Sequence, residues 1–177
     1  QLTFEKLIIS QKIPDDYRQK IKKLKPSLSG CALYLGINTD ISKEKEKTGL
    51  YLNKQRYIVN IPTIHSKKTA QKNKSIIRII GFLANNRSKL TLKEKNRIKN
   101  IYLKKLLKLF PEIKNKIETI TFFSPDSYQK LTNNTNGAFF GTTALTKLSG
   151  KNSLPNKTLL KNLYLCGHWT NPMPAVQ

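Results

Sequence analysis

The residues with the greatest potential for chemistry lie near the end of the chain, where the apolar segment NLYLC is followed by glycine, histidine and tryptophan. This pattern predicts a buried strand over residues 163–166, and a strand that ends in glycine, here Gly167, is typical of ligand sites in open α/β folds. His168 could transfer a proton, but we favour a role for its backbone amide. Trp169 could pack on a flat cofactor or fill the turn.

Other catalytic groups are sparse. The terminal segment has no paired carboxylates, and Cys31 and Cys166 lie far apart without CxxC or histidine at metal-ligand spacing. Each cysteine lies in an apolar run, so we expect buried free thiols and no metal site. His65 has no acid nearby in the sequence and is expected to be structural or to lie at the surface.

The charge is strongly positive, with 33 lysines and arginines against 10 acids and a net charge of +23. Such a charge is typical of nucleic-acid binding, but arginine, which suits bidentate recognition, is scarce, and the lysines are spread over nearly every segment. We therefore expect a solvated basic surface and no specific nucleic-acid partner. A non-enzymatic basic module that binds RNA or an anionic membrane surface remains the alternative.

The first half of the chain predicts a sheet. Pro14 followed by two aspartates indicates the start of a helix that ends before Pro26. Three apolar and β-branched runs predict strands, and because loops rather than helices join them, the sheet should be antiparallel or mixed. The predicted strands cover residues 29–37, 56–62 and 75–84.

A long amphipathic helix is predicted over residues 92–109, where apolar residues recur at spacings near three and four. Thr91 and Glu94 form a capping-box pattern at its start, and Pro111 sets its end. We expect this helix to cover the sheet, while a cationic helix lying on a membrane surface is the alternative. A further strand is predicted over residues 117–125.

The glycine-rich stretch at residues 133–143 places two glycines around Phe139 and Phe140. Close backbone approach to a flat or bulky ligand is one interpretation. An ordinary glycine turn with buried aromatic rings is the other, and on this stretch alone it is favoured.

From about Ser27 to its last residue, the series of segments resembles the C-terminal part of the carotenoid desaturase and isomerase family, the phytoene desaturase-like FAD-dependent oxidoreductases. The motifs that carry the resemblance are SGCALYLGI, the strand ending in IP, the long helix, TFFSPDSYQKLTNNTNGAFFG and NLYLCGHWTNP, in that order. The resemblance implies FAD as cofactor and a lipophilic polyene as substrate, a carotenoid, a retinoid or another isoprenoid lipid, which is desaturated or isomerised.

The implied fold is α/β, present here as an α+β fragment. Residues 1–123 would belong to a mixed-sheet substrate domain covered by helices, and residues 124–177 to a return segment with the last strand of a Rossmann-like FAD-binding domain. The glycine-rich loop that binds the ADP half of FAD is absent from the sequence. We therefore expect a fragment whose partner is the missing N-terminal part of the same polypeptide, and which is inactive alone.

The resemblance also implies site residues. No catalytic residue is assigned, and the expected substrate-binding residues are Tyr34, Gly137, Phe139 and Phe140. The family has glycines where this chain has Met173, Pro174 and Ala175. We favour a shortened loop over replaced glycines, and a cofactor-less remnant of the family is a further alternative. The expected FAD contacts are Gly167, His168, Trp169, Thr170, Pro172, Pro174, Ala175 and Val176.

Targeting signals are not apparent. The first residues lack the basic start and continuous apolar stretch of a signal peptide, and no run approaches the roughly 20 apolar residues of a spanning helix. We expect a cytoplasmic protein with peripheral membrane contact, because a polyene substrate dissolves in lipid.

Overall fold

The computed structural model describes residues 13–52, 56–83, 88–141 and 155–167. They fall into two compact units. The sheet unit comprises Gly30–Leu83 and Lys89–Ser124, and the terminal unit comprises Gln1–Ser29, Ala84–Ser88 and Pro125–Gln177. The assignment of residues 1–123 to a substrate domain and of 124–177 to an FAD-domain segment stays a prediction.

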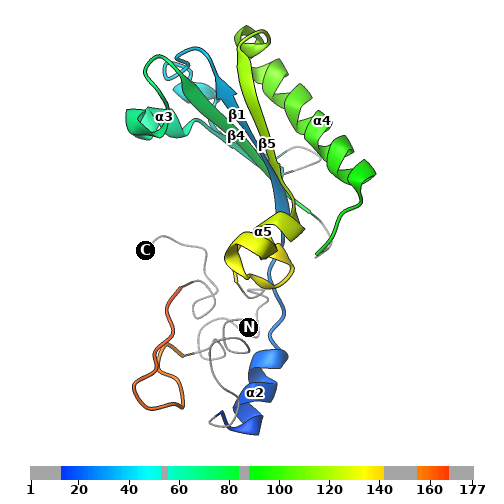
Figure 1. Ribbon diagram of the computed structural model, residues 1–177, viewed down its shortest axis with the longest axis vertical. Coiled ribbons are helices and arrows are strands. Elements are labelled where there is room, and N and C mark those ends of the chain that lie inside the picture. Colours follow the sequence, from blue (N-terminus) through cyan, green and yellow to red (C-terminus); the bar gives the residue numbers. More distant parts are fainter. Residues whose placement is uncertain (1–12, 53–55, 84–87, 142–154, 168–177) are drawn as a thin grey trace. The chain divides into compact units, whose positions relative to one another are not determined.

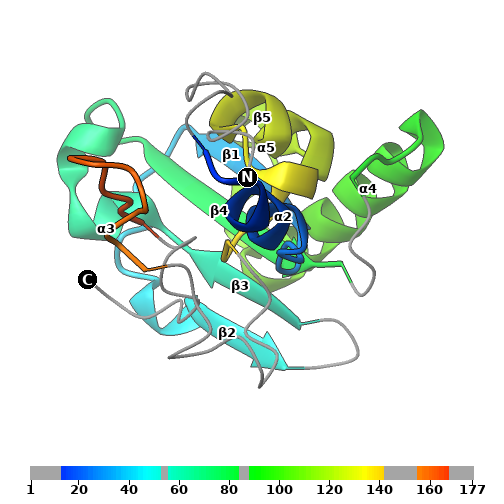
Figure 2. The same cartoon turned by 90° about the horizontal axis from the view of Figure 1, so that it is seen from below.

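The sheet unit is built on five antiparallel strands in the order β2-β3-β4-β1-β5, so the α+β class is confirmed and the sheet is antiparallel, not mixed. Figure 2 shows β2 and β3 side by side at one edge of the sheet. The short strand β2 and the helix α3 (Pro62–His65) were not predicted. The strands are β1 (Gly30–Ile37), β2 (Gly49–Leu52), β3 (Arg56–Asn60), β4 (Ser75–Phe82) and β5 (Ile117–Phe123).

The central strand β1 carries apolar residues on both faces and is hydrogen-bonded to a neighbouring strand along each edge. Leu33 pairs with Ile79 of β4 and with Phe122 of β5. Leu33, Leu35 and Ile37 alternate with residues of the opposite face, as expected for a strand with a two-residue repeat. The continuous apolar run that predicted a central strand is therefore explained.

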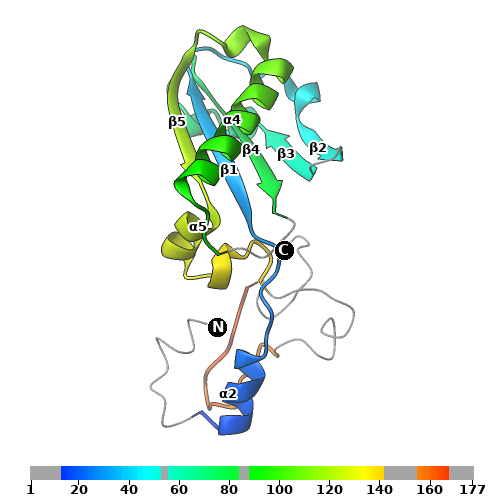
Figure 3. The same cartoon turned by 90° about the vertical axis from the view of Figure 1, so that its right-hand side faces the viewer.

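Helix α4 (Leu92–Leu109) covers one face of this sheet, as predicted (Figures 1 and 3). Tyr102 and Leu106 are buried in the same apolar cluster as Leu33 and Ile79. The strand below must leave room, since a Cβ atom on Gly81 would overlap the Tyr102 side chain. The apolar stripe of the helix therefore packs on the sheet.

The predicted capping box of α4 is present. The Thr91 side chain accepts a hydrogen bond from the Glu94 amide at 3.3 Å, and the Glu94 carboxylate accepts one from the Thr91 amide at 2.8 Å. Two amides that the helix itself leaves without acceptors are thereby satisfied.

A short helix and a 3-10 turn connect β3 to β4. Helix α3 (Pro62–His65) begins with proline, and η3 (Lys67–Thr69) follows it. The loop before β2 contains η2 (Lys45–Lys47), and η4 (Pro111–Ile113) follows α4. These turns lie at the ends of the strands.

The described part of the terminal unit has a small core of its own. Helix α2 (Asp15–Lys22) begins after Pro14, as predicted, and buries Tyr17 and Ile21. Leu160, Leu163 and Leu165 pack against this helix. The unit also contains helix α5 (Pro125–Thr132) and the turn η5 (Thr135–Gly137).

The prediction of a buried strand at residues 163–166 is wrong. The segment makes a single bridge, between Tyr164 and Lys157, and Tyr164 is 67% exposed. The amide and the hydroxyl of Thr158 both donate to the Leu163 carbonyl, at 3.1 and 2.9 Å. These local hydrogen bonds close a turn where a sheet ladder was expected. Only alternate side chains are half-buried, and they contact α2.

Candidate functional site

The sheet face opposite α4 is the best candidate for a functional surface in the sheet unit. We call it the open face. Its side chains are those that alternate with the buried cluster under α4, and most of them are half-buried or exposed. A strand with apolar residues on both faces normally has both faces covered, so the apolar open face calls for a partner. The open face includes Leu50, Ile58, Ile80, Ala32, Phe123, Asn60, Arg78, Tyr34 and Thr121.

An apolar row crosses the open face. The sheet register places Leu50 opposite Ile58, Ile58 opposite Ile80, Ile80 opposite Ala32, and Ala32 opposite Phe123. Leu50 is 57% exposed at one end of the row. The small Ala32 side chain lies between larger neighbours. The row is therefore a continuous apolar strip that spans all five strands.

A polar row runs beside the apolar row, two residues along each strand. It consists of Asn60, Arg78, Tyr34 and Thr121 in register. The Arg78 guanidinium donates to the Asn60 side-chain oxygen at 2.6 Å. The Tyr34 ring meets the Phe123 ring edge to face, with centroids 5.6 Å apart and planes at 82°. This edge-to-face contact joins Tyr34 of the polar row to Phe123 of the apolar row.

Of the four predicted substrate residues, the structure places only Tyr34 on the open face. Gly137, Phe139 and Phe140 belong to the terminal unit. Gly137 has φ of 63°, and a Cβ atom there would overlap the Pro125 backbone, so its close approach is to this chain itself. Phe139 packs edge to face on Tyr128 at 4.9 Å. The favoured interpretation, a glycine turn with packed rings, describes this stretch well, and a role in substrate binding stays a prediction.

Of the predicted FAD contacts, Gly167 alone lies within the described residues. It is exposed, has φ of 103°, and has no atom within 4 Å of the position a Cβ would take. A ligand could therefore approach its backbone closely. The remaining predicted FAD contacts lie outside the described residues: His168, Trp169, Thr170, Pro172, Pro174, Ala175 and Val176.

The predictions for other reactive groups are mixed. Cys31 is buried as predicted, whereas the prediction of a buried thiol at Cys166 is wrong because the segment that holds it is not a buried strand. His65 lies exposed at the end of α3, as predicted. Within the described ranges, no group of histidine, cysteine and carboxylate side chains could hold a metal ion. No helix in these ranges is long and apolar enough to cross a membrane.

Sequence reasoning missed most of the open face. The signal was present in β4, where SIIRIIGF is apolar at both odd and even positions. Ile77 and Ile79 are buried beneath α4, while Ile76 and Ile80 belong to the opposite face. A run with only one apolar face would have predicted a solvated second face. Sequence reasoning also missed a lysine-lined pocket, described below, because the positive charge was interpreted as evenly spread.

Comparison with known proteins finds a likeness in fold. No protein-family model matches the chain, and no curated protein matches it. The crystal structure of an oxidoreductase from Methanosarcina mazei is similar, with a TM-score of 0.54 and 18% sequence identity over 93% of this chain. The match covers 34% of that protein, so this chain spans about a third of its length. At this identity, the likeness establishes the fold alone.

Proposed function

We propose that the chain is part of an FAD-dependent oxidoreductase that desaturates or isomerises a polyene or isoprenoid lipid. The observation that carries the proposal is the apolar row, which crosses all five strands and could pack along an elongated apolar molecule. The fold likeness to an oxidoreductase and the order of the sequence motifs support the same class.

The chain's own residues would bind and orient the substrate. The side chains of Ile58, Ile80 and Phe123 would pack along the polyene and exclude water from it. Arg78 and Tyr34, in the polar row alongside, would contact a hydroxyl or carboxyl group of the substrate. The chemistry supplied by bound FAD would be the acceptance of hydride equivalents from the polyene.

The location proposed for FAD rests on Gly167 and the residues that follow it. Gly167 suits a cofactor-binding position because its positive φ and the open space beside it allow close approach to its backbone. The grip on the pyrophosphate would come from a dinucleotide-binding domain in the missing N-terminal part of the same polypeptide. Peripheral membrane contact is proposed as the route by which a lipid-soluble substrate enters.

The first test measures polyene binding to this chain by the gain in retinol fluorescence. Ile58→Asn places an amide in the apolar row and should weaken binding about tenfold, because the amide must lose its water to make the contact. Leu92→Asn alters a 74% exposed leucine at the start of α4 and should leave binding unchanged. Circular dichroism checks folding, and Leu50→Asn, at the exposed end of the row, repeats the test with less risk to the fold. Equal binding by all variants would contradict the proposal.

The second test asks whether flavin is bound. The product of the complete reading frame that contains this chain should retain flavin absorbance after gel filtration, whereas the 177-residue chain alone should not. Anaerobic addition of phytoene or retinol should bleach the flavin band if the reaction is a desaturation. A complete product without flavin, combined with tight RNA binding at physiological salt, would favour the basic-module alternative.

A further inference from the structure

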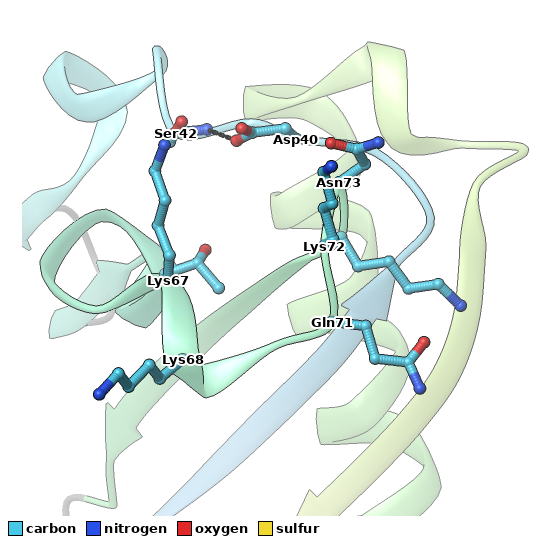
Figure 4. A pocket seen from close by; sticks show the side chains of 9 residues that line it. Asp40, Ser42, Lys67, Lys68, Gln71, Lys72 and Asn73 are labelled. Carbon is cyan, nitrogen blue, oxygen red and sulfur yellow. Dashed lines mark hydrogen bonds between the residues drawn. The ribbon is translucent and has the colours of Figure 1, made fainter.

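A lysine-lined pocket lies in the sheet unit, where the loop after β1 meets the segment between α3 and β4 (Figure 4). Its volume is about 410 Å³. We call it the lysine pocket and define it by Asp40, Thr63, Lys67, Lys68, Lys72, Asn73 and Lys74. All of these residues belong to one unit, so the pocket does not depend on the terminal unit.

The walls of the pocket are held by specific hydrogen bonds. The Asp40 carboxylate accepts from the Ser42 amide at 2.8 Å, which fixes the turn after β1. The preceding amide, that of Ile41, donates to the buried Ser75 hydroxyl at 3.0 Å and joins this turn to β4. Asn73 adopts a left-handed φ of 62°, a conformation that asparagine tolerates. The pocket therefore has a defined shape without a ligand.

Positive charge is in excess in the pocket. Four lysines line it against the single carboxylate of Asp40. Lys74 is paired with Glu118 at 2.7 Å. The charge of Lys67 helps to lower the pKa of Asp40, after the larger effect of the Ser42 hydrogen bonds. Within the described ranges, Lys68 and Lys72 have no ion-pair partner. An anion would relieve this imbalance.

The buried hydroxyl of Thr63 also indicates a ligand in the pocket, independently of the lysine charges. It is 4% exposed and lines the pocket, and its hydroxyl has no hydrogen-bond partner within the described parts of the chain. Buried hydroxyl groups are nearly always paired, because an unpaired one costs free energy. A buried donor at the wall of a cationic pocket points to an acceptor that completes it.

We propose that the lysine pocket binds a phosphate group. A phosphate offers several acceptor oxygens and more than one negative charge, which matches several ammonium groups together with the Thr63 hydroxyl and the Asn73 amide. The pocket is large enough for a diphosphate. The phosphate could be that of a free small molecule or of a lipid headgroup, and the two sources share this chemistry. The inference is independent of the function proposed for the open face.

The test titrates inorganic diphosphate into the whole 177-residue chain at physiological salt. NMR measures the shifts of the backbone amides. Diphosphate should produce saturable shifts at the amides of residues 40–42 and 63–74. Thr63→Val should weaken binding about tenfold, while Thr63→Ser, which keeps the hydroxyl, should bind nearly as the parent does. Combined replacement Lys67→Gln, Lys68→Gln and Lys72→Gln should abolish saturation.

A matched control removes the same charge elsewhere. Lys93→Gln, Lys104→Gln and Lys108→Gln alter three exposed lysines of α4 and should leave diphosphate affinity within twofold of the parent. Equal weakening by the pocket triple and the control triple would overturn the proposal. So would diphosphate shifts that spread over the whole lysine surface without saturation, together with vesicle binding that is equal for the two triples.

Vesicles distinguish the two sources of phosphate. Phosphatidylcholine vesicles with and without phosphatidic acid are sedimented with the chain and with both triples. Binding that requires phosphatidic acid and is lost only in the pocket triple, without saturable diphosphate shifts, identifies a lipid headgroup. Saturable diphosphate shifts without vesicle binding identify a free phosphate ligand. If neither probe distinguishes the two triples, the pocket does not bind phosphate.

Discussion

Replacing Thr63 by valine should stabilise the ligand-free sheet unit. The Thr63 hydroxyl is buried and has no partner within the described residues, so it lost its water on folding without gaining a hydrogen bond. Such a group costs about 1–3 kcal/mol. Valine has nearly the same shape, and helix propensity hardly distinguishes the two residues. We expect the free energy of unfolding to rise by about 1–2 kcal/mol.

Amide hydrogen exchange of Ile77 and Ile79 is the appropriate assay. Both residues are fully buried in β4, so their amides exchange only when the sheet unit opens. A gain of about 1–2 kcal/mol slows exchange by roughly five- to thirtyfold. Thr121→Val, at an exposed position of β5, serves as the control and should change the free energy of unfolding by less than about 0.5 kcal/mol.

The opposite sign would refute the reasoning. If Thr63→Val accelerates exchange at Ile77 and Ile79, the hydroxyl has a partner in the ligand-free chain, and valine has broken a hydrogen bond. The gain in the free energy of unfolding at saturating diphosphate should then be compared between the two proteins. Diphosphate should stabilise the parent more than Thr63→Val, because only the parent can donate to the ligand.

Three further outcomes are expected. Leu106→Ala should lower the free energy of unfolding by about 2–5 kcal/mol in hydrogen exchange, because it leaves a cavity under α4. Thr91→Ala should cost about 1 kcal/mol in the same assay, since the capping box is lost. Ser42→Ala should raise the pKa of Asp40, which the Ser42 hydrogen bonds hold below its ordinary value, in a carboxyl NMR titration. Because the pKa is lowered by folding, this stabilisation is present above the unfolded-state pKa and is lost as the pH falls through the folded-state value.

The elements with strong local signals were predicted correctly. The capping box of Thr91 and Glu94 and the regular spacing of apolar residues determined α4 to the residue. The apolar run of β1 and the β-branched runs of β3 and β4 also predicted strands, because such side chains suit a pleated, packed surface. These signals are local, so a single sequence contains them.

The failures arose where tertiary context decides. LYLC at residues 163–166 has the composition of a buried strand, yet hydrogen bonds from Thr158 close it into a turn and α2 takes up its leucines. The lysine pocket depends on Asp40 meeting Lys67 and Lys72 across a fold, which spacing along the chain does not reveal. Only part of the open face was predicted from the sequence. Tyr34 was named as a candidate substrate contact, but its neighbours across the sheet were not.

The position of β1 between β4 and β5 has a consequence for synthesis of the chain. Leu33 cannot complete its contacts until Ile79 and then Phe122 have left the ribosome. At roughly 5–20 residues per second, the interval between translation of Leu33 and Phe122 is on the order of ten seconds. Throughout that interval this apolar strand has an unpaired edge, which other chains could join. Chaperone dependence during translation should therefore be greatest before Phe122 emerges, and truncation just before β5 should yield an aggregating product.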